Sequence, residues 1–384
     1  MNSSRIGLAA WIAVACLCSG CVDDTGSGKE ARPGQLPGVT GIRYLAGGNN
    51  NGFLRARSPR NFTFPADYGA HPGFRTEWWY LTGNLDTPTD RHFGFELTFF
   101  RVALAPDAVT RESAWSGNSV WMAHFALTDP AAGQFRPAEK LGREALGLAG
   151  AVASPFRVWL DDWQIVEREP GVLSVEAGDG EAAIYLELRG LDRIVLQGDA
   201  GLDRKGPEPG NASFYYSAPR LSVTGRVMSS DGAADAVSGT AWLDREWSTS
   251  ALSPGIAGWD WFALQLDDGR DLMFYRLRQE DGGTSAYSGG SITDGAGNTR
   301  RLAASEVELQ VLDYWQSASS GVVYPVAWRM RIASLGTDLV IEPFLPNQEL
   351  NLSVRYWEGA VRVLEDSAAP RRALGRGYLE LAGY

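Results

Sequence analysis

The sequence predicts an all-β chain built from short antiparallel strands. Segments of alternating apolar and polar residues end at Gly, Asp, Asn or Pro, and helical periodicity is scarce. The 45 glycines and 14 tryptophans among 384 residues fit this pattern, because regularly spaced short strands with turn residues are typical of barrels or sandwiches. The clearest expected strands cover residues 93–101, 183–189, 220–227, 272–278, 322–333 and 378–381.

Residues 1–20 have the pattern of a secretory leader. Arg5 supplies the positive start, and residues 6–17 form an apolar core that is too short to cross a bilayer. The sequence LCSGC that follows resembles a bacterial lipobox ending at Cys21, although Cys18 stands where an aliphatic residue is usual. We expect removal of the leader and lipidation of Cys21, with plain cleavage nearby as the alternative.

The segment 21–50 is expected to be a flexible linker, because it is rich in Asp, Gly, Ser, Lys and Pro. Val22 stands where an aspartate would indicate retention in the inner membrane. The sequence therefore favours a lipid anchor on the periplasmic face of the outer membrane over the inner membrane or secretion. No cysteine follows Cys21, so the mature chain would have no disulfide.

Charge and motif content exclude several classes of function. A net charge of −11 argues against nucleic acid, and against a membrane partner beyond the lipid anchor. The sequence has no GxSxG, no GxGxxG after a strand, no GxxxxGKS/T, and none of the HxH, HxxxH or HExxH spacings. We therefore expect no cofactor, no metal and no serine-hydrolase site.

An internal repeat predicts a duplicated β-domain. EWWYLTGNL at 77–85 aligns with GWDWFALQL at 258–266, and LTFFR at 97–101 aligns with LMFYR at 272–276. Each pair of segments is a strand, a turn and a second strand. We expect an N-terminal domain at 51–249 and a C-terminal domain at 250–384, with chance similarity of two aromatic hairpins as the alternative.

Strand alternation gives the two copies similar faces. In the first copy, Trp78 and Tyr80 share one face, and Glu77 and Trp79 share the other. Both copies thus place an acid on the face opposite paired aromatic residues. The second copy carries Trp259 and Trp261 on the first face and Asp260 on the opposite face.

Asp260 lies between two tryptophans, and its role has two alternatives. It could be a general acid with a raised pKa, or an acceptor for a ligand hydroxyl. It could instead accept hydrogen bonds from a buried arginine. Arg101 and Arg276 close the second strand of each hairpin and are natural partners for the two acids.

A second dense motif, TAWLDREW at 240–247, precedes the second copy. On a strand, Trp242, Asp244 and Glu246 share one face. Two strand rises put these carboxylates about 7 Å apart, so they repel unless one is protonated or a cation lies between them. The motif therefore indicates either an acid–base pair or a surface or buried ion network.

Of the three histidines, His124 is the strongest candidate for a catalytic role. It lies in the apolar strand WMAHFALTD, where it could act as a general base with Glu77 or Asp260, or could be a core histidine with satisfied hydrogen bonds. His71 lies just before the first copy of the repeat, and His92 falls in an expected hairpin turn.

Seven motifs together resemble a known family. The chain is similar to the AttH-like, lipocalin-like family of secreted proteins, which is related to carotenoid 1,2-hydratase (hydroxyneurosporene synthase). The resemblance covers about residues 60–384. The motifs, in order, are HPGFRTEWWYLTGNL, FGFELTFFR, WMAHFALTD, YYSAPRLSVTG, SGTAWLDREWS, GWDWFALQLDDGRDLMFYRLR and GRGYLELAGY.

This resemblance implies two tandem lipocalin-like antiparallel β-barrels, with a site near their junction. It also implies cofactor-free addition of water to an isoprenoid double bond, in which a carboxylic acid protonates the alkene. The chain departs from the hydratases at two places. Arg245 stands where their D-H-x-W motif has histidine, and Arg276 and Leu277 follow Tyr275 where an aspartate is expected.

Three functions follow as hypotheses. The first is a lipid-anchored protein that binds an apolar or amphipathic ligand, such as a lipid or isoprenoid, between the barrels. The second is a cofactor-independent hydratase- or hydrolase-like enzyme, and the third is an accessory component of an export-type transporter. The alternative to all three is a structural role, in which the charges form a buried network between two barrels with filled interiors. The candidate catalytic residues are Asp260, Asp244, Glu246, Glu77 and His124. The candidate ligand-binding residues are Trp78, Trp79, Tyr80, Trp247, Trp259, Trp261, Tyr275, Arg101 and Arg276.

Overall fold

The computed structural model describes residues 50–106, 116–229, 232, 234–250, 252–366 and 370–384. The expected leader at 1–20, the lipidation site Cys21 and nearly all of the linker at 21–50 lie outside the described residues. None of the helices in the described ranges has the length and apolar composition needed to span a membrane. The leader and the lipid anchor therefore stay predictions.

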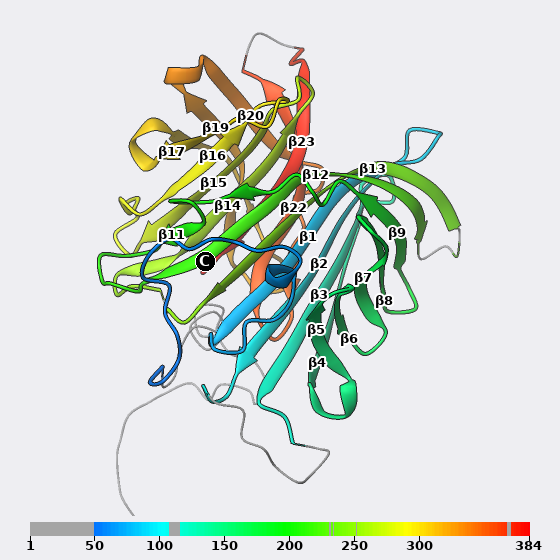
Figure 1. The fold of residues 1–384 in the computed structure, drawn as a ribbon. Coiled ribbons are helices and arrows are strands. Elements are labelled where there is room, and N and C mark those ends of the chain that lie inside the picture. Colours follow the sequence, from blue (N-terminus) through cyan, green and yellow to red (C-terminus); the bar gives the residue numbers. More distant parts are fainter. Residues whose placement is uncertain (1–49, 107–115, 230–231, 233, 251, 367–369) are drawn as a thin grey trace, which may run out of the picture. The chain divides into compact units, whose positions relative to one another are not determined.

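The regular secondary structure of the described chain is almost entirely β-strand, arranged in two curled antiparallel sheets (Figure 1). The prediction of an all-β fold with two tandem lipocalin-like barrels is confirmed. Strands β1 to β13 form the first sheet and strands β14 to β23 form the second, so the sheets follow each other along the chain.

The first sheet has the strand order β4-β3-β2-β1-β13-β12-β9-β8-β7-β6-β5, and β10 and β11 pair with β12. The long strands β12 and β13 join the hairpin of the first repeat to the remaining strands of the barrel. The strands are β1 (Thr76–Asp86), β2 (His92–Ala103), β3 (Ser119–Asp129), β4 (Gln134–Arg143), β5 (Ala149–Ala153), β6 (Phe156–Leu160), β7 (Trp163–Glu169), β8 (Val172–Gly178), β9 (Ala183–Arg189), β10 (Val195–Leu196), β11 (Leu202–Arg204), β12 (Ala212–Met228) and β13 (Ala234–Ser248).

The second sheet has the order β17-β16-β15-β14-β23-β22-β20-β19-β18, and β21 pairs with β22. Its strands are β14 (Ile256–Leu266), β15 (Asp271–Gln279), β16 (Gly289–Thr293), β17 (Thr299–Ala303), β18 (Glu308–Gln316), β19 (Val323–Ile332), β20 (Thr337–Pro343), β21 (Glu349–Asn351), β22 (Arg355–Glu365) and β23 (Ala373–Ala382). The 3-10 helices of the described chain are η1 (Ala66–Tyr68), η2 (Ala145–Gly147), η3 (Ala304–Glu306) and η4 (Ala333–Leu335).

The two hairpins of the sequence repeat have matching registers. Strand β1 pairs with β2 and places Glu77 opposite Arg101, while β14 pairs with β15 and places Asp260 opposite Arg276. In the strand pairing, Glu77 and Asp260 therefore occupy equivalent positions. The ungapped sequence alignment instead places them two residues apart. An acid faces the last arginine of the motif in both copies.

Each hairpin buries both of its faces, and this explains its dense aromatic content. On β1, Trp79 and Leu81 point into the core of the first barrel, and on β14, Phe262 and Leu264 point into the core of the second. The alternate residues of both strands meet in a third apolar cluster between the sheets, which includes Tyr80, Tyr215, Trp242, Trp261, Met273, Tyr275 and Tyr378. The two barrels therefore share one buried interface.

Close backbone approach and polar contacts hold the two sheets together. Strand β1 lies against β23, β2 against β22, and β12 against β14. A Cβ atom at Gly94 would lie 2.4 Å from the Cβ of Ala360, so only glycine permits this spacing. The side-chain amide of Asn84 donates to the Gly377 carbonyl at 3.1 Å, across the interface.

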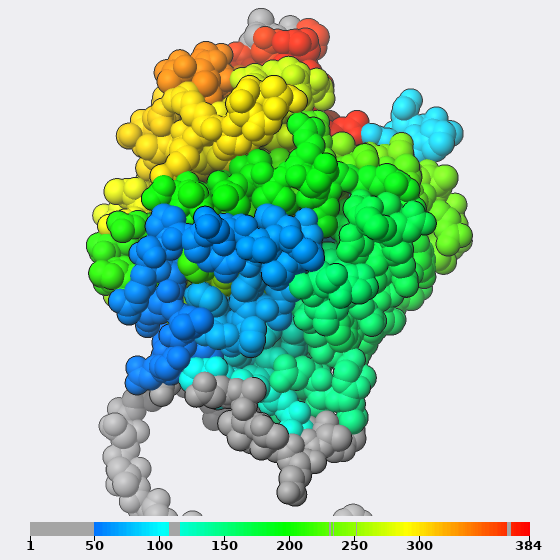
Figure 2. Space-filling model, in the orientation of Figure 1, coloured from blue at the N-terminus to red at the C-terminus, as the bar shows by residue number. Residues whose placement is uncertain are grey.

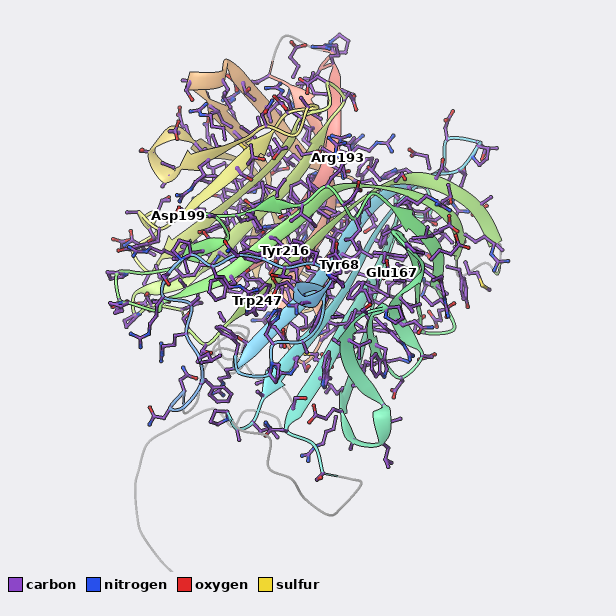
Figure 3. All side chains as sticks on the ribbon, viewed as in Figure 1. Tyr68, Glu167, Arg193, Asp199, Tyr216 and Trp247 are labelled. Atoms are coloured by element: carbon purple, nitrogen blue, oxygen red, sulfur yellow. The ribbon has the colours of Figure 1, made fainter. Side chains whose placement is uncertain are left out.

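The chain before β1 crosses the outer side of strands β12 and β13. Figure 2 shows this segment, in dark blue, on the presented face of the molecule. Aromatic side chains fix it, because Tyr68 packs near Tyr216 and Trp247, all labelled in Figure 3. The Tyr216 hydroxyl also donates to the Asp67 carbonyl at 3.2 Å. The segment thus adds a separate aromatic cluster, in which Trp247 is fully buried.

Candidate functional site

A cavity of about 190 Å³ lies between the two sheets, where the hairpins of both copies meet. Its walls are mostly apolar, include several aromatic rings, and come from both sides of the interface. The ring of Tyr80 meets that of Trp261 edge-on, with centroids 5.1 Å apart. The aromatic walls include Trp78, Tyr80, Phe100, Trp259, Trp261 and Tyr275.

Asp244 on β13 lines this cavity and is almost completely buried. Its Oδ1 accepts hydrogen bonds from Ser217 Oγ at 2.5 Å and Trp242 Nε1 at 2.7 Å, and Tyr215 Oη donates to its Oδ2. Burial raises the pKa of Asp244 to about 7 despite these three donors, and the nearby Glu246 adds to the rise. The Asp244 carboxyl therefore keeps its proton to a much higher pH than an ordinary aspartate does.

Glu246 lies two residues along the same face, beside the cavity-lining Lys205. The Lys205 ammonium is 3.4 Å from Glu246 Oε1 and 2.5 Å from Asp203 Oδ2, and it lies 4.1 Å from the ring centroid of Tyr275. Burial raises the pKa of Glu246 although Lys205 opposes this. The sequence suggests a cation between the carboxylates of Asp244 and Glu246. The structure places the Lys205 ammonium beside Glu246, but Lys205 makes no contact with Asp244.

Glu380 on β23 is a cavity acid that the sequence hypothesis did not include. Its Oε1 accepts a hydrogen bond from Trp259 Nε1 at 3.0 Å, and within the described residues its Oε2 has no recorded partner. Burial raises the pKa of Glu380 to about 8, and the charges of Glu246 and Asp244 add to this although the Trp259 bond lowers it. Glu380 is therefore mostly protonated at neutral pH.

Two further buried acids lie behind Glu380. Glu358 on β22 is directly opposite Glu380 in the ladder and accepts a hydrogen bond of 2.5 Å from Tyr80 Oη. Burial raises the pKa of Glu358 and of Glu96, and the two other acids of this cluster raise that of Glu358 further. In the described chain, no arginine or lysine pairs with these three glutamates, so burial favours their neutral forms.

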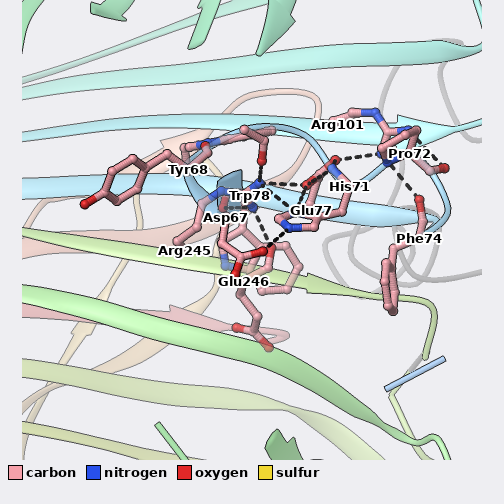
Figure 4. Close-up of polar contacts among 12 residues, drawn as sticks. Asp67, Tyr68, His71, Pro72, Phe74, Glu77, Trp78, Arg101, Arg245 and Glu246 are labelled. Atoms are coloured by element: carbon pink, nitrogen blue, oxygen red, sulfur yellow. Dashed lines mark hydrogen bonds and ion pairs between the residues drawn. The ribbon is translucent and has the colours of Figure 1, made fainter. Parts of the chain in front are cut away.

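Glu77, the acid of the opening repeat, is held by cations instead. Arg101 Nη1 donates to its Oε1 at 2.8 Å and Arg245 Nη2 to its Oε2 at 2.7 Å, and the His71 backbone N–H adds a bond of 2.9 Å (Figure 4). Burial alone would raise the pKa of Glu77, but Arg245, His71 and Arg101 outweigh it and lower it to about 2. Glu77 borders the cavity, yet its carboxylate is fully occupied.

Asp260 has the same kind of environment in the second barrel. It is fully buried and accepts hydrogen bonds from Arg276 Nε at 2.7 Å, Arg278 Nη1 at 3.1 Å and Tyr384 Oη at 2.5 Å. It does not line the cavity, because it shares the face of β14 that carries Phe262 into the barrel core. The alternative of a buried-arginine partner therefore fits Asp260, and the structure does not place it as a cavity acid.

The structure also separates the other sequence candidates into two groups. Trp78, Tyr80, Trp259, Trp261, Tyr275 and Arg101 line the cavity, whereas Trp79, Trp247, Arg276 and His124 do not. Trp79 stacks on Trp121 in the first barrel at a centroid distance of 5.6 Å, and Trp247 stacks on His71 at 3.8 Å. Strand alternation explains both, since each tryptophan follows a cavity-lining residue by one position.

Sequence reasoning missed Lys205, Tyr356 and Glu380 as cavity residues. The terminal motif YLEL does alternate, so Tyr378 and Glu380 share a face. The local sequence does not show that this face contacts β14 and the first barrel, because that contact depends on pairing between strands that are distant in the sequence. Lys205 comes from the irregular chain after β11, where no periodicity guides prediction.

The fold and the cavity together define an all-β protein with two barrels and a buried aromatic site at their junction. The family model described as AttH-like matches residues 55–384. The chain therefore belongs to the AttH-like family. A solved structure of an AttH candidate from Nitrosomonas europaea is 36% identical, with a TM-score of 0.76, and the match covers 86% of this chain and 100% of that one.

Two more comparisons involve a hydratase. The solved kievitone hydratase of Nectria haematococca is 14% identical with a TM-score of 0.60, covering 86% of this chain and 98% of that chain, which shows a shared fold. The kievitone hydratase of Fusarium solani subsp. phaseoli is 21% identical over 186 residues, or 45% of this chain and 49% of that protein. The match thus spans about half the length of this curated relative.

Replacing Asp260 by asparagine tests the buried ion network of the second barrel. Asp260→Asn leaves Arg276 and Arg278 buried without a carboxylate, so we expect unfolding free energy to fall by about 3–5 kcal/mol. Chemical denaturation measures this loss. Asp268→Asn, which breaks an exposed pair with Arg270, is the control and should cost at most about 1 kcal/mol. Equal small losses in both variants would contradict the assignment.

Asp244 should make stability depend on pH. Its pKa is raised from 3.8 to about 7 in the folded chain, so the native state binds more protons than the unfolded state between these values. Stability conferred by this group is therefore lost as pH rises from about 4 to about 7, by roughly 2–4 kcal/mol. Asp244→Asn mimics the neutral form and should show a flatter profile of unfolding free energy over this range. Identical profiles for the variant and the wild type would rule out a raised pKa.

Proposed function

We propose that the protein is a cofactor-independent hydratase-like enzyme that protonates an alkene in the cavity between the barrels. The observation that carries this proposal is a pair of carboxyls with raised pKa values, the buried Asp244 and the partly exposed Glu380, in a cavity whose walls are largely apolar. A carboxylic acid kept neutral at pH 7 can serve as a general acid. The shared fold with kievitone hydratase supports the same class of reaction.

Glu380 is the better placed proton donor of the two. Trp259 holds its Oε1, which leaves Oε2 for the substrate, whereas both oxygens of Asp244 are hydrogen-bonded. Transfer of the Glu380 proton to one alkene carbon would leave a cation on the other carbon. The new carboxylate and the faces of Trp78 and Trp259 would stabilise that cation until water adds.

The size and charge of the cavity limit the substrate. A cavity of 150 Å³ lined by apolar side chains holds benzene, so about 190 Å³ accommodates only a slightly larger group. A branched five-carbon alkene at the end of a larger molecule fits this volume. The neutral state of Glu380 and the pairing of Lys205 with acids favour an uncharged group at this end.

A ligand-binding protein is the second candidate, and the apolar walls of the cavity favour it. In this case the neutral carboxyls would donate hydrogen bonds to a hydroxyl or carbonyl of the ligand, without proton transfer to carbon. Anchoring through Cys21 at the periplasmic face of a membrane would place such a protein where lipids and isoprenoids are exchanged. The same anchor would suit an accessory component of an export-type transporter.

Substitution of Glu380 separates catalysis from binding. Wild-type protein is incubated with geraniol or kievitone in ¹⁸O-labelled water, and mass spectrometry detects addition of one labelled water. We expect Glu380→Gln to lower this turnover by about 10²–10⁴-fold. Binding, followed by quenching of the tryptophans around the cavity, should change less than about tenfold, since one hydrogen bond contributes roughly 1.4 kcal/mol or less.

The matched control is Asp271→Asn, which alters a buried acid paired with Arg220 away from the cavity. Turnover by this variant should stay near the wild-type value. Binding of either probe without any labelled product would instead support the ligand-binding function. Full turnover in Glu380→Gln would contradict the assignment of Glu380 as the proton donor.

A further inference from the structure

We propose that Tyr356, His124 and Glu139 form a proton relay that takes up the proton released when water adds to the substrate. The inference rests on the proposed hydratase function and deepens it. Tyr356 lines the cavity and is the catalytic member of the relay. His124 and Glu139 are positioning residues that act through its hydroxyl, as a base and its orienting carboxylate do in catalytic triads.

The three side chains form a continuous chain of hydrogen bonds. His124, on β3, is fully buried, and its Nδ1 lies 2.7 Å from Tyr356 Oη on β22. Its Nε2 lies 3.0 Å from Glu139 Oε1 on β4. The rings of Phe100 and Tyr356, each with its centroid 5.5 Å from that of the imidazole, fix the orientation of His124.

The outer carboxylate determines where the imidazole carries its proton. Burial alone would raise the pKa of Glu139, but hydrogen bonds from His124 and Ser353 outweigh it and lower the pKa. An ionised carboxylate only accepts hydrogen bonds, so Nε2 of His124 must keep its proton. In the neutral imidazole, Nδ1 is then an acceptor that faces the Tyr356 hydroxyl.

The relay connects the cavity with solvent. Tyr356 pairs with Ala382 while Glu358 pairs with Glu380, so Tyr356 and Glu380 are diagonal neighbours, with Cα atoms about 7–8 Å apart. The proposed donor and the proposed acceptor therefore lie on adjacent strands beside one cavity. At the outer end, the Glu139 side chain is 16% exposed and can exchange protons with water.

The reaction balances without any other reactant. The π electrons of the alkene take the Glu380 proton and form a C–H bond, which leaves a carbocation. A water oxygen then forms the C–O bond and becomes positively charged. It releases a proton to Tyr356 Oη as the Tyr356 proton passes to Nδ1 of His124. After the C–O bond has formed, Nδ1 of His124 returns this proton through the Tyr356 hydroxyl and a water molecule to the Glu380 carboxylate. Both groups regain their starting states, so the net change is alkene plus water to alcohol.

Burial and the neighbouring acids favour this concerted transfer over a free tyrosinate. Burial raises the pKa of Tyr356, and so do Glu96 from β2, Glu358 from β22, Glu380 from β23 and Glu139 from β4. A phenolate among four acids is costly. The hydroxyl can therefore act as a base only when its own proton leaves at the same time, and Nδ1 of His124 is the acceptor that the structure provides.

The chain also contains a comparable histidine that has no access to the cavity. His92 Nδ1 lies 3.0 Å from Asp86, which also binds Arg376 from the second sheet, and its ring stacks on Phe344 with centroids 3.9 Å apart. These contacts of His92 join the two sheets, as the hydrogen bonds of His124 do, but His92 does not line the cavity. His92→Gln is therefore the matched control for a purely structural contribution.

The first test needs no substrate. The chain has three histidines, so ¹⁵N-histidine spectra of the wild type, His71→Gln and His92→Gln assign all ring nitrogens. In neutral His124 we expect a protonated Nε2 and an unprotonated Nδ1, and Tyr356→Phe should shift Nδ1 towards the value of a free ring nitrogen. A protonated Nδ1 in the neutral ring would overturn the relay, because it could not accept the Tyr356 proton.

The second test uses labelled-water turnover of geraniol. Tyr356→Phe and His124→Gln should lose about 10²–10³-fold in kcat, with KM within threefold of wild type, whereas His92→Gln should keep both values. Glu139→Gln should lower kcat and move the acidic limb of the pH–rate profile to lower pH, because loss of the carboxylate disfavours a protonated imidazole. Unchanged pH profiles and equal losses in Glu139→Gln and His92→Gln would overturn the relay.

The two tests distinguish the failure of each proposal. Absence of turnover by the wild type overturns the hydratase function, while the nitrogen spectra still decide whether the relay has the required proton positions. Normal turnover with full activity in Tyr356→Phe overturns the relay and leaves the donor role of Glu380 intact. Circular dichroism of each variant shows whether any loss reflects unfolding.

Discussion

The face-to-face packing of the two central hairpins is the interaction on which the rest of the structure depends. Strands β1 and β14 are buried on both faces, one towards a barrel core and the other towards the partner sheet. The carboxyl groups of Glu77, Glu96, Asp244, Asp260 and Glu358 are consequently removed from water. Each must gain a cation or remain protonated, because an isolated buried charge is far too costly.

Both arrangements occur in this protein, and they lie on opposite faces of the central strands. Glu77 and Asp260, which lie on the faces of the barrel interiors, each bind two arginines. Glu380, Glu358 and Glu96 lie between the sheets, and no arginine or lysine among the described residues neutralises them. The arginine-paired acids Glu77 and Asp260 therefore lie towards the barrel interiors, and the three glutamates without a basic partner lie between the sheets. The raised pKa values of the acids between the sheets make this interface the candidate functional region.

The alternation of residues in the repeat was enough to predict the fold and much of the cavity wall. Trp78, Tyr80, Trp259 and Trp261 follow from a period of two within a local sequence. The role of Asp260 did not follow, because the sequence does not show which face of β14 meets the other barrel. Glu380 and Tyr356 depend on the pairing of β22 with β23 and on packing against β1 and β2, which are interactions between distant parts of the chain.

The matched register of Glu77–Arg101 and Asp260–Arg276 has a consequence for how the site arose. The duplicated hairpin carries the same internal ion pair in each half, but neither half alone contains the cavity, since its acids and aromatic rings come from opposite sheets. A single ancestral barrel could have had the pair without the cavity. Whatever chemistry the cavity performs would then be a property of the duplicated chain, and it would be lost if the two halves were separated.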